Sequence, residues 1–212
     1  MKQFFYHVSE LGKRIVISLT PFLVDYVVVL VFLSPPVTSL FSFFNDNEQR
    51  VKTAITKKIL SEYCGDRKLA NLFMKVGNLY NIDPFFLYSV ADVDSNLEKN
   101  KITEKEDGGK LVGLMQINVA DYSDYSQDNL FDCEINLRLG ANELRNAMNH
   151  GKGNMMKTLA VYHANSFTSK YGQLTLDYIE NVRKKYLDIQ RSEKLYIQEN
   201  YDLFNVKKNP TY

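Results

Sequence analysis

The sequence has 212 residues, of which 45% are hydrophobic and 24% are charged, and its formal net charge is +1. This composition is typical of a folded globular protein and excludes a chain that is disordered throughout. A nearly balanced charge provides no basic face for nucleic acid, so we expect no nucleic-acid partner.

Residues 1–35 have the pattern of a membrane anchor. The run from Ile15 to Leu33 is almost continuously apolar, close to the roughly 20 residues that cross a bilayer. Lys2, Lys13 and Arg14 precede this run, and the next basic residue is Arg50. Because positive charge stays on the cytoplasmic side, the rest of the chain is predicted to lie outside the cytoplasm.

Two residues within the run, Pro21 and Asp25, are unfavourable in a membrane helix. A cleaved signal peptide is therefore the alternative, with the small residues 37–39 as a peptidase site. We favour a retained anchor in the cytoplasmic membrane because the run is long for a signal peptide. In both cases the domain is exported.

The two cysteines, Cys64 and Cys133, suit an oxidising compartment and could form a disulfide. Two separate buried thiols are the alternative.

The remaining pattern predicts a mainly helical domain over residues 49–190. Residues 36–48 contain a Pro pair, Ser and Asn, as linkers do. Helical periodicity then begins, and Asp83 with Pro84 marks the start of a helix that runs to about Leu97. Residues 98–112 predict a loop or small hairpin, and three helices are expected at about 132–149, 154–164 and 171–189. Residues 191–212 are expected to form a loosely packed polar tail.

Four short motifs follow one another in a fixed order between residues 68 and 187. They are Val93-Asp94-Ser95-Asn96-Leu97; Gly113-Leu114-Met115-Gln116-Ile117; Asn129-Leu130-Phe131-Asp132 with Asn136-Leu137-Arg138-Leu139-Gly140; and Leu159-Ala160-Val161-Tyr162-His163-Ala164-Asn165 with a later Tyr178-Ile179. This order resembles the soluble lytic transglycosylase family, a branch of the lysozyme superfamily. The resemblance implies a lysozyme-like fold, mainly α with a small β part (α+β), here preceded by the transmembrane segment.

The resemblance also implies an activity on peptidoglycan glycan strands that needs no cofactor. Such enzymes cleave the β-1,4 bond between MurNAc and GlcNAc without water and leave a 1,6-anhydroMurNAc end. One carboxyl group acts first as general acid and then as general base. It must be protonated near neutral pH, which requires a poorly solvated site.

Small exported members of this family often accompany secretion or conjugation machines, which would be the protein partners here. The domain would then lie in the bacterial cell envelope, on the periplasmic side of the inner membrane. The alternative is a non-catalytic, transglycosylase-like structural component of such a machine. A phage-borne wall-degrading protein would share the chemistry.

The position that matches the family's catalytic Glu is Asp94, whose side chain is shorter by one methylene, or about 1.5 Å. We favour Asp94 as a working acid. It could instead be the remnant of a lost site, or Glu98, one helical turn later, could supply the acid. Asp92 points in another direction on the helix and is expected to be a solvated surface charge.

By the same resemblance, six residues are expected to bind substrate or support the acid: Ser95, Met115, Gln116, Tyr162, His163 and Tyr178. Ser95 would orient the acid, or else bond to the helix backbone. Met115 and Gln116 would line the N-acetyl-sugar subsites, with core packing as the alternative for Met115. Tyr162 would lie close to the acid, and Tyr178 on the other side of the cleft.

His163 stands where the family has Asn in a Tyr-Asn-Ala-Gly turn, and Asn165 replaces the Gly. We expect no metal site at His163, because no carboxylate or thiol lies at ligand spacing around it.

Overall fold

Most of the backbone that the structure describes is helical. The structure is a computed structural model that describes residues 35–164 and 172–200. The helices are α2 (Pro35–Cys64), α3 (Arg67–Tyr80), α4 (Pro84–Ser95), α5 (Gln127–Phe131), α6 (Cys133–Gly151), α7 (Met155–Ala164) and α8 (Gln173–Glu199), with a 3₁₀ turn η1 (Val119–Tyr122). Three short strands, β1 (Ile102–Glu104), β2 (Lys110–Val112) and β3 (Ile117–Asn118), lie between α4 and η1.

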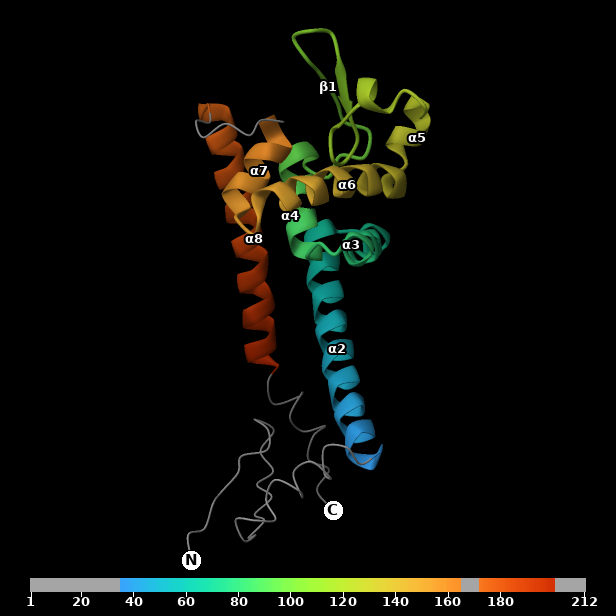
Figure 1. Cartoon of the computed structure of the whole chain (residues 1–212), viewed down its shortest axis with the longest axis vertical. Helices are drawn as coiled ribbons and strands as arrows, with labels where there is room; N and C mark the ends of the chain where they lie inside the picture. The colour runs from blue at the N-terminus through green and yellow to red at the C-terminus, as the bar shows by residue number, and fades with distance from the viewer. Residues whose placement is uncertain (1–34, 165–171, 201–212) are drawn as a thin grey trace, which may run out of the picture. The chain divides into compact units, whose positions relative to one another are not determined.

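The chain divides into two compact units, Met1–Lys52 and Thr53–Tyr212, and the core and the candidate site belong to the second. Within this unit α4 packs against α3 and α8, α6 packs against α3 and α7, and α7 packs against α8 (Figure 1). The core is formed mainly by apolar side chains of these helices, of which Leu87 and Val90 of α4 and Phe73 of α3 are completely buried.

Helix α4 begins where the sequence predicts. The carboxylate of Asp83 accepts a hydrogen bond of 2.9 Å from the backbone N–H of Phe85, and Pro84 occupies the first turn. The helix ends at Ser95, two residues earlier than expected. Asn96 and Leu97 then adopt left-handed backbone angles, with φ of 56° and 59°, which stops the helix immediately after Asp94 and Ser95.

The strands form one antiparallel sheet in the order β1-β2-β3. Its first two strands confirm the small hairpin predicted in residues 98–112, with Ile102 opposite Val112. The hairpin projects beyond the helices, and β2 leads directly into the Gly113–Gln116 segment (Figure 1).

Two helices are longer than predicted. The segment 36–48, expected to be a linker, is the first part of the continuous helix α2. Helix α8 continues to Glu199, where a loose polar tail was expected from residue 191. In the second half of α8, Ile189 is completely buried, and the Thr56 hydroxyl of α2 donates to Glu193 over 3.1 Å. Residues 201–212 lie outside the described residues.

The predicted membrane anchor at residues 1–35 falls almost entirely outside the described residues, so the anchor remains a prediction. Among the helices that the structure describes, none has the length and apolar character needed to span a bilayer.

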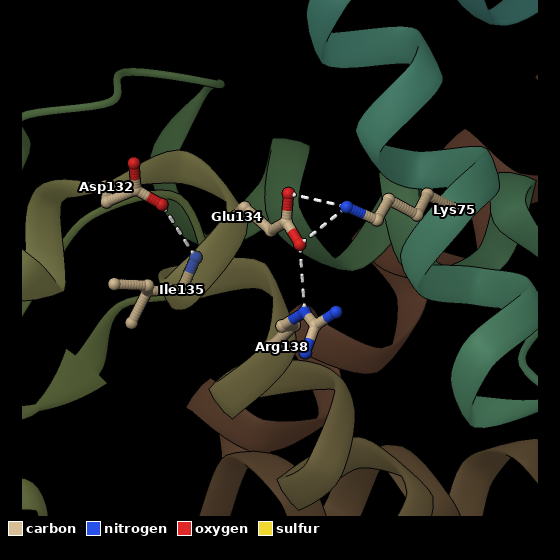
Figure 2. Close-up of polar contacts among 5 residues, drawn as sticks. All are labelled: Lys75, Asp132, Glu134, Ile135 and Arg138. Atoms are coloured by element: carbon tan, nitrogen blue, oxygen red, sulfur yellow. Dashed lines mark hydrogen bonds and ion pairs between the residues drawn. The ribbon is translucent and has the colours of Figure 1, made fainter.

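The first two turns of helix α6 are held by a capping hydrogen bond and by ion pairs. The Asp132 carboxylate caps it by accepting from the N–H of Ile135 over 2.9 Å. Glu134 accepts from Lys75 of α3 over 2.8 Å and pairs with Arg138 on α6 itself (Figure 2). These ion pairs lie at the surface, so each adds little stability and serves mainly to set the approach of α3 to α6.

A buried amide joins α6 to the sheet and to the segment after it. Asn136 is completely buried, and its Oδ1 accepts from the N–H of Met115 over 2.8 Å. Its Nδ2 donates to the carbonyls of Val112 and Leu130 over 2.9 Å and 2.8 Å. Gly113 has a φ of +78°, and a Cβ there would lie 2.2 Å from the Asn136 amide nitrogen, so only glycine allows this approach.

We therefore predict that Asn136→Ala destabilises the domain by about 2–4 kcal/mol, because three buried backbone groups lose their partner. The matched control is Asn142→Ala, the same change at an exposed position of α6, which should cost about 0.5 kcal/mol or less. Urea unfolding of both variants measures the difference. Equal midpoints would show that the Asn136 bonds do not stabilise the fold.

Candidate active site

Asp94 lies in the last turn of α4, with its carboxyl turned towards α7. The hydroxyl of Tyr162 donates a hydrogen bond of 3.1 Å to Oδ2 of Asp94. The same hydroxyl lies 3.4 Å from the carbonyl oxygen of Met115. One tyrosine thus connects α4, α7 and the segment that follows β2, and the side chain of Asp94 remains partly exposed.

Tyr178 of α8 provides a second hydroxyl beside the same carboxyl. Its hydroxyl is buried and has no hydrogen bond of normal geometry among the described residues, yet it is near enough to Asp94 to lower the pKa of that carboxyl. Burial and the charge of Asp94 raise the pKa values of both Tyr162 and Tyr178 well above the usual range. Both tyrosines are therefore neutral donors throughout the physiological pH range.

A lysine fixes the backbone at the end of α4. The Nζ of Lys101 donates to the backbone carbonyl of Asp94 over 2.8 Å. Its positive charge also favours the ionised form of the carboxyl. Lys101 comes from the turn before β1, so the hairpin and the acid are joined directly.

The proton affinity of Asp94 results from opposing effects. Desolvation is the largest effect and raises the pKa of Asp94. Tyr178, Tyr162 and Lys101 lower the pKa, and Glu143 raises it. The net pKa of Asp94 is about 7. A carboxyl with this pKa is protonated in slightly acidic solution and half ionised near neutrality. Such a group can both donate and accept a proton at physiological pH.

The family comparison agrees with this arrangement. The family model described as Transglycosylase SLT domain matches residues 71–174, which contain Asp94 and Tyr162. Residues 71–174 form an SLT domain of the lytic transglycosylase type. The described part of the chain is accordingly a mainly helical, lysozyme-like SLT domain, as the motif order predicts.

Among solved structures, the lytic transglycosylase Slt from Pseudomonas aeruginosa, determined as an inactive Glu-to-Gln mutant, is similar at 15% identity with a TM-score of 0.48. The similarity covers 57% of this chain and 24% of that one, so the chain spans about a quarter of that protein. No curated protein matches the sequence.

Glu98 occupies an exposed turn of the SLT domain, after α4 has ended. Asp94, by contrast, accepts a hydrogen bond from Tyr162 of α7.

Asp92 differs from its prediction. Its side chain is buried rather than solvated and forms an ion pair with Lys185 of α8. Helix α8 covers this face of α4, which the sequence of α4 alone could not indicate. Asp92 thus joins two helices of the SLT domain.

Ser95 does not contact the Asp94 carboxyl among the described residues. It is completely buried, and its hydroxyl donates to the backbone carbonyl of Ala91 over 3.0 Å. This is the backbone bond that the sequence left open as the alternative, because a serine near a helix end can reach the carbonyl four residues earlier.

Met115 and Gln116 are both held by protein contacts. Met115 is 2% exposed and packs against Gly140, where a Cβ would lie 2.4 Å from the Met115 Cβ. This is the core packing considered as its alternative role. The Gln116 amide nitrogen donates to the carbonyl of Gly113 over 2.9 Å and also approaches the carbonyl of Lys101. The side-chain oxygen of Gln116 accepts from the hydroxyl of Thr103, so only its second lone pair has capacity left for a sugar. The predicted sugar contacts of Met115 and Gln116 remain predictions.

His163 is placed beside Tyr178 instead of beside the acid. The two rings stack with centroids 4.3 Å apart, and Nδ1 of His163 lies 3.3 Å from the Thr175 hydroxyl. Burial lowers the pKa of His163, so the ring is neutral at physiological pH. Asn165 lies outside the described residues. Within the described part of the chain no three His, Cys, Asp or Glu side chains are grouped as metal ligands would be.

Cys64 and Cys133 are free thiols in the structure, which is the second of the two alternatives that the sequence left open. Burial raises the pKa of Cys64 to about 12 and that of Cys133 less strongly. Both thiols pack at the edge of the hydrophobic core, where they act as small apolar side chains.

The sequence analysis missed Glu143 of α6, whose carboxylate accepts from the Tyr122 hydroxyl over 2.9 Å. A signal was present: Asn136, Gly140 and Glu143 follow one another at positions i, i+4 and i+7, which places a carboxylate on the buried stripe of the helix. A charged residue in such a stripe is unusual and indicates a partner or a function.

We predict that Asp94→Asn stabilises the folded domain at neutral pH. The folded-state pKa of about 7 exceeds the unfolded value of 3.8, so the wild type loses stability as pH rises from about 4 to about 7. The Asn variant lacks this loss. Its advantage should be absent below pH 4 and reach a few kcal/mol at pH 8, since one pKa unit corresponds to about 1.4 kcal/mol.

Melting temperatures at pH 4 and pH 8 test this. Asp124→Asn, at an exposed position, is the control and should change stability equally at both pH values. If both variants changed the melting temperature equally at pH 4 and pH 8, the raised pKa of Asp94 would be contradicted.

Proposed function

We propose that this protein is a peptidoglycan lytic transglycosylase that cleaves the MurNAc–GlcNAc β-1,4 bond and leaves a 1,6-anhydroMurNAc end, with Asp94 as its acid and base. The observation that carries the proposal is the environment of Asp94 within an SLT domain. Burial raises its pKa to about 7, and Tyr162 fixes the carboxyl with a hydrogen bond of 3.1 Å.

In the first step the protonated carboxyl of Asp94 donates its proton to the glycosidic oxygen, the bond from that oxygen to C1 of MurNAc breaks, and GlcNAc leaves as an alcohol. Positive charge develops at C1 and the ring oxygen, while the carboxylate of Asp94 is now negative. In the second step this carboxylate takes the proton of the C6 hydroxyl and O6 bonds to C1. The proton is regenerated on Asp94, and water is not consumed.

Tyr162 and Lys101 have complementary parts in this cycle. The Tyr162 hydroxyl can donate to Asp94 most strongly when the carboxyl is ionised, that is, after the first step. Lys101 holds the backbone carbonyl of Asp94 and so limits where the short side chain can reach. A rigid position is needed because a displacement of about 1 Å at a catalytic group can cost about 100-fold in rate.

We predict that wild-type protein releases 1,6-anhydro muropeptides from purified sacculi and that Asp94→Asn reduces the release at least 100-fold, since an amide cannot protonate the leaving oxygen. Release should decline above about pH 7, where Asp94 ionises. Mass spectrometry of the products measures both effects. Glu98→Gln is the control, and its activity should equal that of the wild type.

Two outcomes would contradict this function. Loss of activity in Glu98→Gln with retention in Asp94→Asn would make Glu98 the acid. Product from Asp94→Glu but none from the wild type would show that the longer side chain restores a lost activity. The protein would then be a non-catalytic, transglycosylase-like component of an envelope machine.

We further propose that residues 1–35 anchor the protein in the inner membrane and that the domain acts on the periplasmic side, in association with a secretion or conjugation machine. The proposal is supported by Lys2, Lys13 and Arg14, which precede the apolar run, and by the location of the substrate.

This topology predicts that alkaline phosphatase fused after Tyr212 is active and that a cytoplasmic fluorescent reporter at the same place is not. Substituting Glu for Lys2, Lys13 and Arg14 should reduce the phosphatase signal, because orientation depends on these charges. An inactive phosphatase fusion in the unsubstituted protein would place the domain in the cytoplasm, away from peptidoglycan.

A further inference from the structure

Lys101 lies where the hairpin, the Gly113–Gln116 segment and the acid meet. Its Nζ donates to the backbone carbonyl of Asp94 over 2.8 Å. Its own backbone carbonyl accepts from the N–H of Gly113 over 2.9 Å, which continues the pairing of β1 with β2 by one residue. The side chain and the main chain of Lys101 therefore contact different elements at the same time.

The side chain of Gln116 joins Lys101 to strand β1. Its amide nitrogen lies 3.4 Å from the carbonyl oxygen of Lys101, and its amide oxygen accepts from the hydroxyl of Thr103. Lys101 and Thr103 are two positions apart in an extended segment, so their side chains point to the same side. A continuous chain of hydrogen bonds thus runs from the Thr103 hydroxyl through the Gln116 amide and Lys101 to the backbone of Asp94.

The backbone of Gln116 is held in a conformation that its residue type rarely adopts. Its φ is +46°, in the left-handed region that favours glycine. Such a conformation persists only where the surrounding structure fixes it. The side chain of Gln116 bonds to Thr103, Gly113 and Lys101, and these bonds fix it at the base of the hairpin, which projects beyond the helices (Figure 1).

The end of α4 receives a donor from outside the helix. Carbonyl groups in the last turn of a helix have no partner within it, and the chain leaves the helix at Asn96 with a φ of 56°. The ammonium of Lys101 bonds to the Asp94 carbonyl there, and a cation is favourable at a helix C-terminus. Tyr162 holds the carboxyl of the same residue. Asp94 is therefore held at both its backbone and its side chain.

We propose that Lys101 is a positioning residue for the acid, which transmits the position of strand β1, through Thr103 and Gln116, to the backbone of Asp94. The inference rests on the proposed function only in that Asp94 is taken as the acid. Lys101 neither touches the sugar nor transfers a proton in this scheme. An Asp has fewer rotatable bonds than a Glu with which to correct a displaced backbone, so the place of its carboxyl depends more directly on where the backbone is held.

The test is the ¹³C signal of the Asp94 carbonyl in the full chain, solubilised in detergent. Asp94-Ser95 is the only Asp-Ser pair in the sequence, so protein labelled with ¹³C in the Asp carbonyl and ¹⁵N in Ser gives a single correlated signal. Lys101→Met keeps an apolar stem but removes the ammonium, so this signal should move as the carbonyl loses its hydrogen bond. Lys101→Arg keeps a cationic donor and should return the signal towards its wild-type position.

Lys99→Met is the matched control, because it is the same substitution in the same turn. Lys99 pairs with Asp66 at the start of α3 over 3.1 Å. This variant should leave the Asp94 carbonyl signal unchanged. An Asp94 signal that is the same in Lys101→Met as in the wild type would overturn the inference, whether or not the protein cleaves peptidoglycan.

Thr103→Val tests the transmission from β1, since it removes the hydroxyl and keeps the branched shape. It should move the Asp94 carbonyl signal in the wild-type background but not in Lys101→Met, where the chain of hydrogen bonds is already interrupted. Residues that act through one another give non-additive effects of this kind. An equal displacement in both backgrounds would show that Lys101 does not transmit the position of β1.

Activity separates this inference from the proposed function. Lys101→Met should lower kcat about tenfold with KM nearly unchanged, since a displaced acid affects cleavage more than binding. The decline of release at high pH should begin at a higher pH, because a cation that lowers the pKa of Asp94 is lost while Tyr162, Tyr178 and Glu143 are retained.

Lys101→Arg should recover both the rate and the pH profile. An increase of KM with kcat unchanged would make Lys101 a binding residue and overturn the inference. No product from the wild type, together with the expected NMR changes, would contradict the enzyme function and leave the role of Lys101 intact.

Discussion

The buried amide of Asn136 is the interaction on which the arrangement of the active site depends. It holds the carbonyls of Val112 and Leu130 and the N–H of Met115 through three hydrogen bonds. These groups belong to the strand, the short helix and the connecting segment, which have few other means of keeping a fixed position. Because the Met115 carbonyl contacts Tyr162, the position of the tyrosine that holds the acid follows from the same amide. A buried network of this kind is stabilising only when every member is satisfied, and here both side-chain atoms of Asn136 and the three backbone groups have partners.

Local chemistry was sufficient to predict the elements whose ends are set by their own residues. Asp83 with Pro84 fixes the start of α4, and the glycine pair of residues 108–109 fixes the hairpin. The ends that depend on distant partners could not be predicted in this way. Helix α8 extends to Glu199, with Glu193 bonded to Thr56 of α2, and Asp92 is buried against α8, where it pairs with Lys185. Both facts concern residues more than 90 positions away, which no local pattern contains.

In the candidate site, too, some features could be predicted from the sequence and others depend on contacts with distant residues. The motif order identified Asp94 and Tyr162, which the structure brings to 3.1 Å from each other, and it identified Tyr178 beside them. It assigned sugar contacts to residues that the structure uses largely for packing or backbone bonds, because a motif records which residues occur together and not which atoms they contact. Glu143, whose carboxylate accepts from Tyr122, lies outside the short motifs that carry the resemblance and was therefore not among the predicted site residues.

The identity of the acid alone does not decide whether such a site can work. Burial would raise the proton affinity of any carboxyl at this place, and two tyrosines and Lys101 would lower it again. Because desolvation outweighs the groups that lower it, the pKa of Asp94 lies near 7, and a change in a nearby charge alters the fraction of Asp94 that is protonated at neutral pH. A site with Asp in place of Glu therefore has two requirements. The shorter side chain must place its carboxyl close enough to the bond to be cleaved, and the carboxyl must have a suitable proton affinity. The position of the carboxyl depends on α4 and on the contact of its backbone with Lys101. Its proton affinity depends also on side chains from α6, α7 and α8.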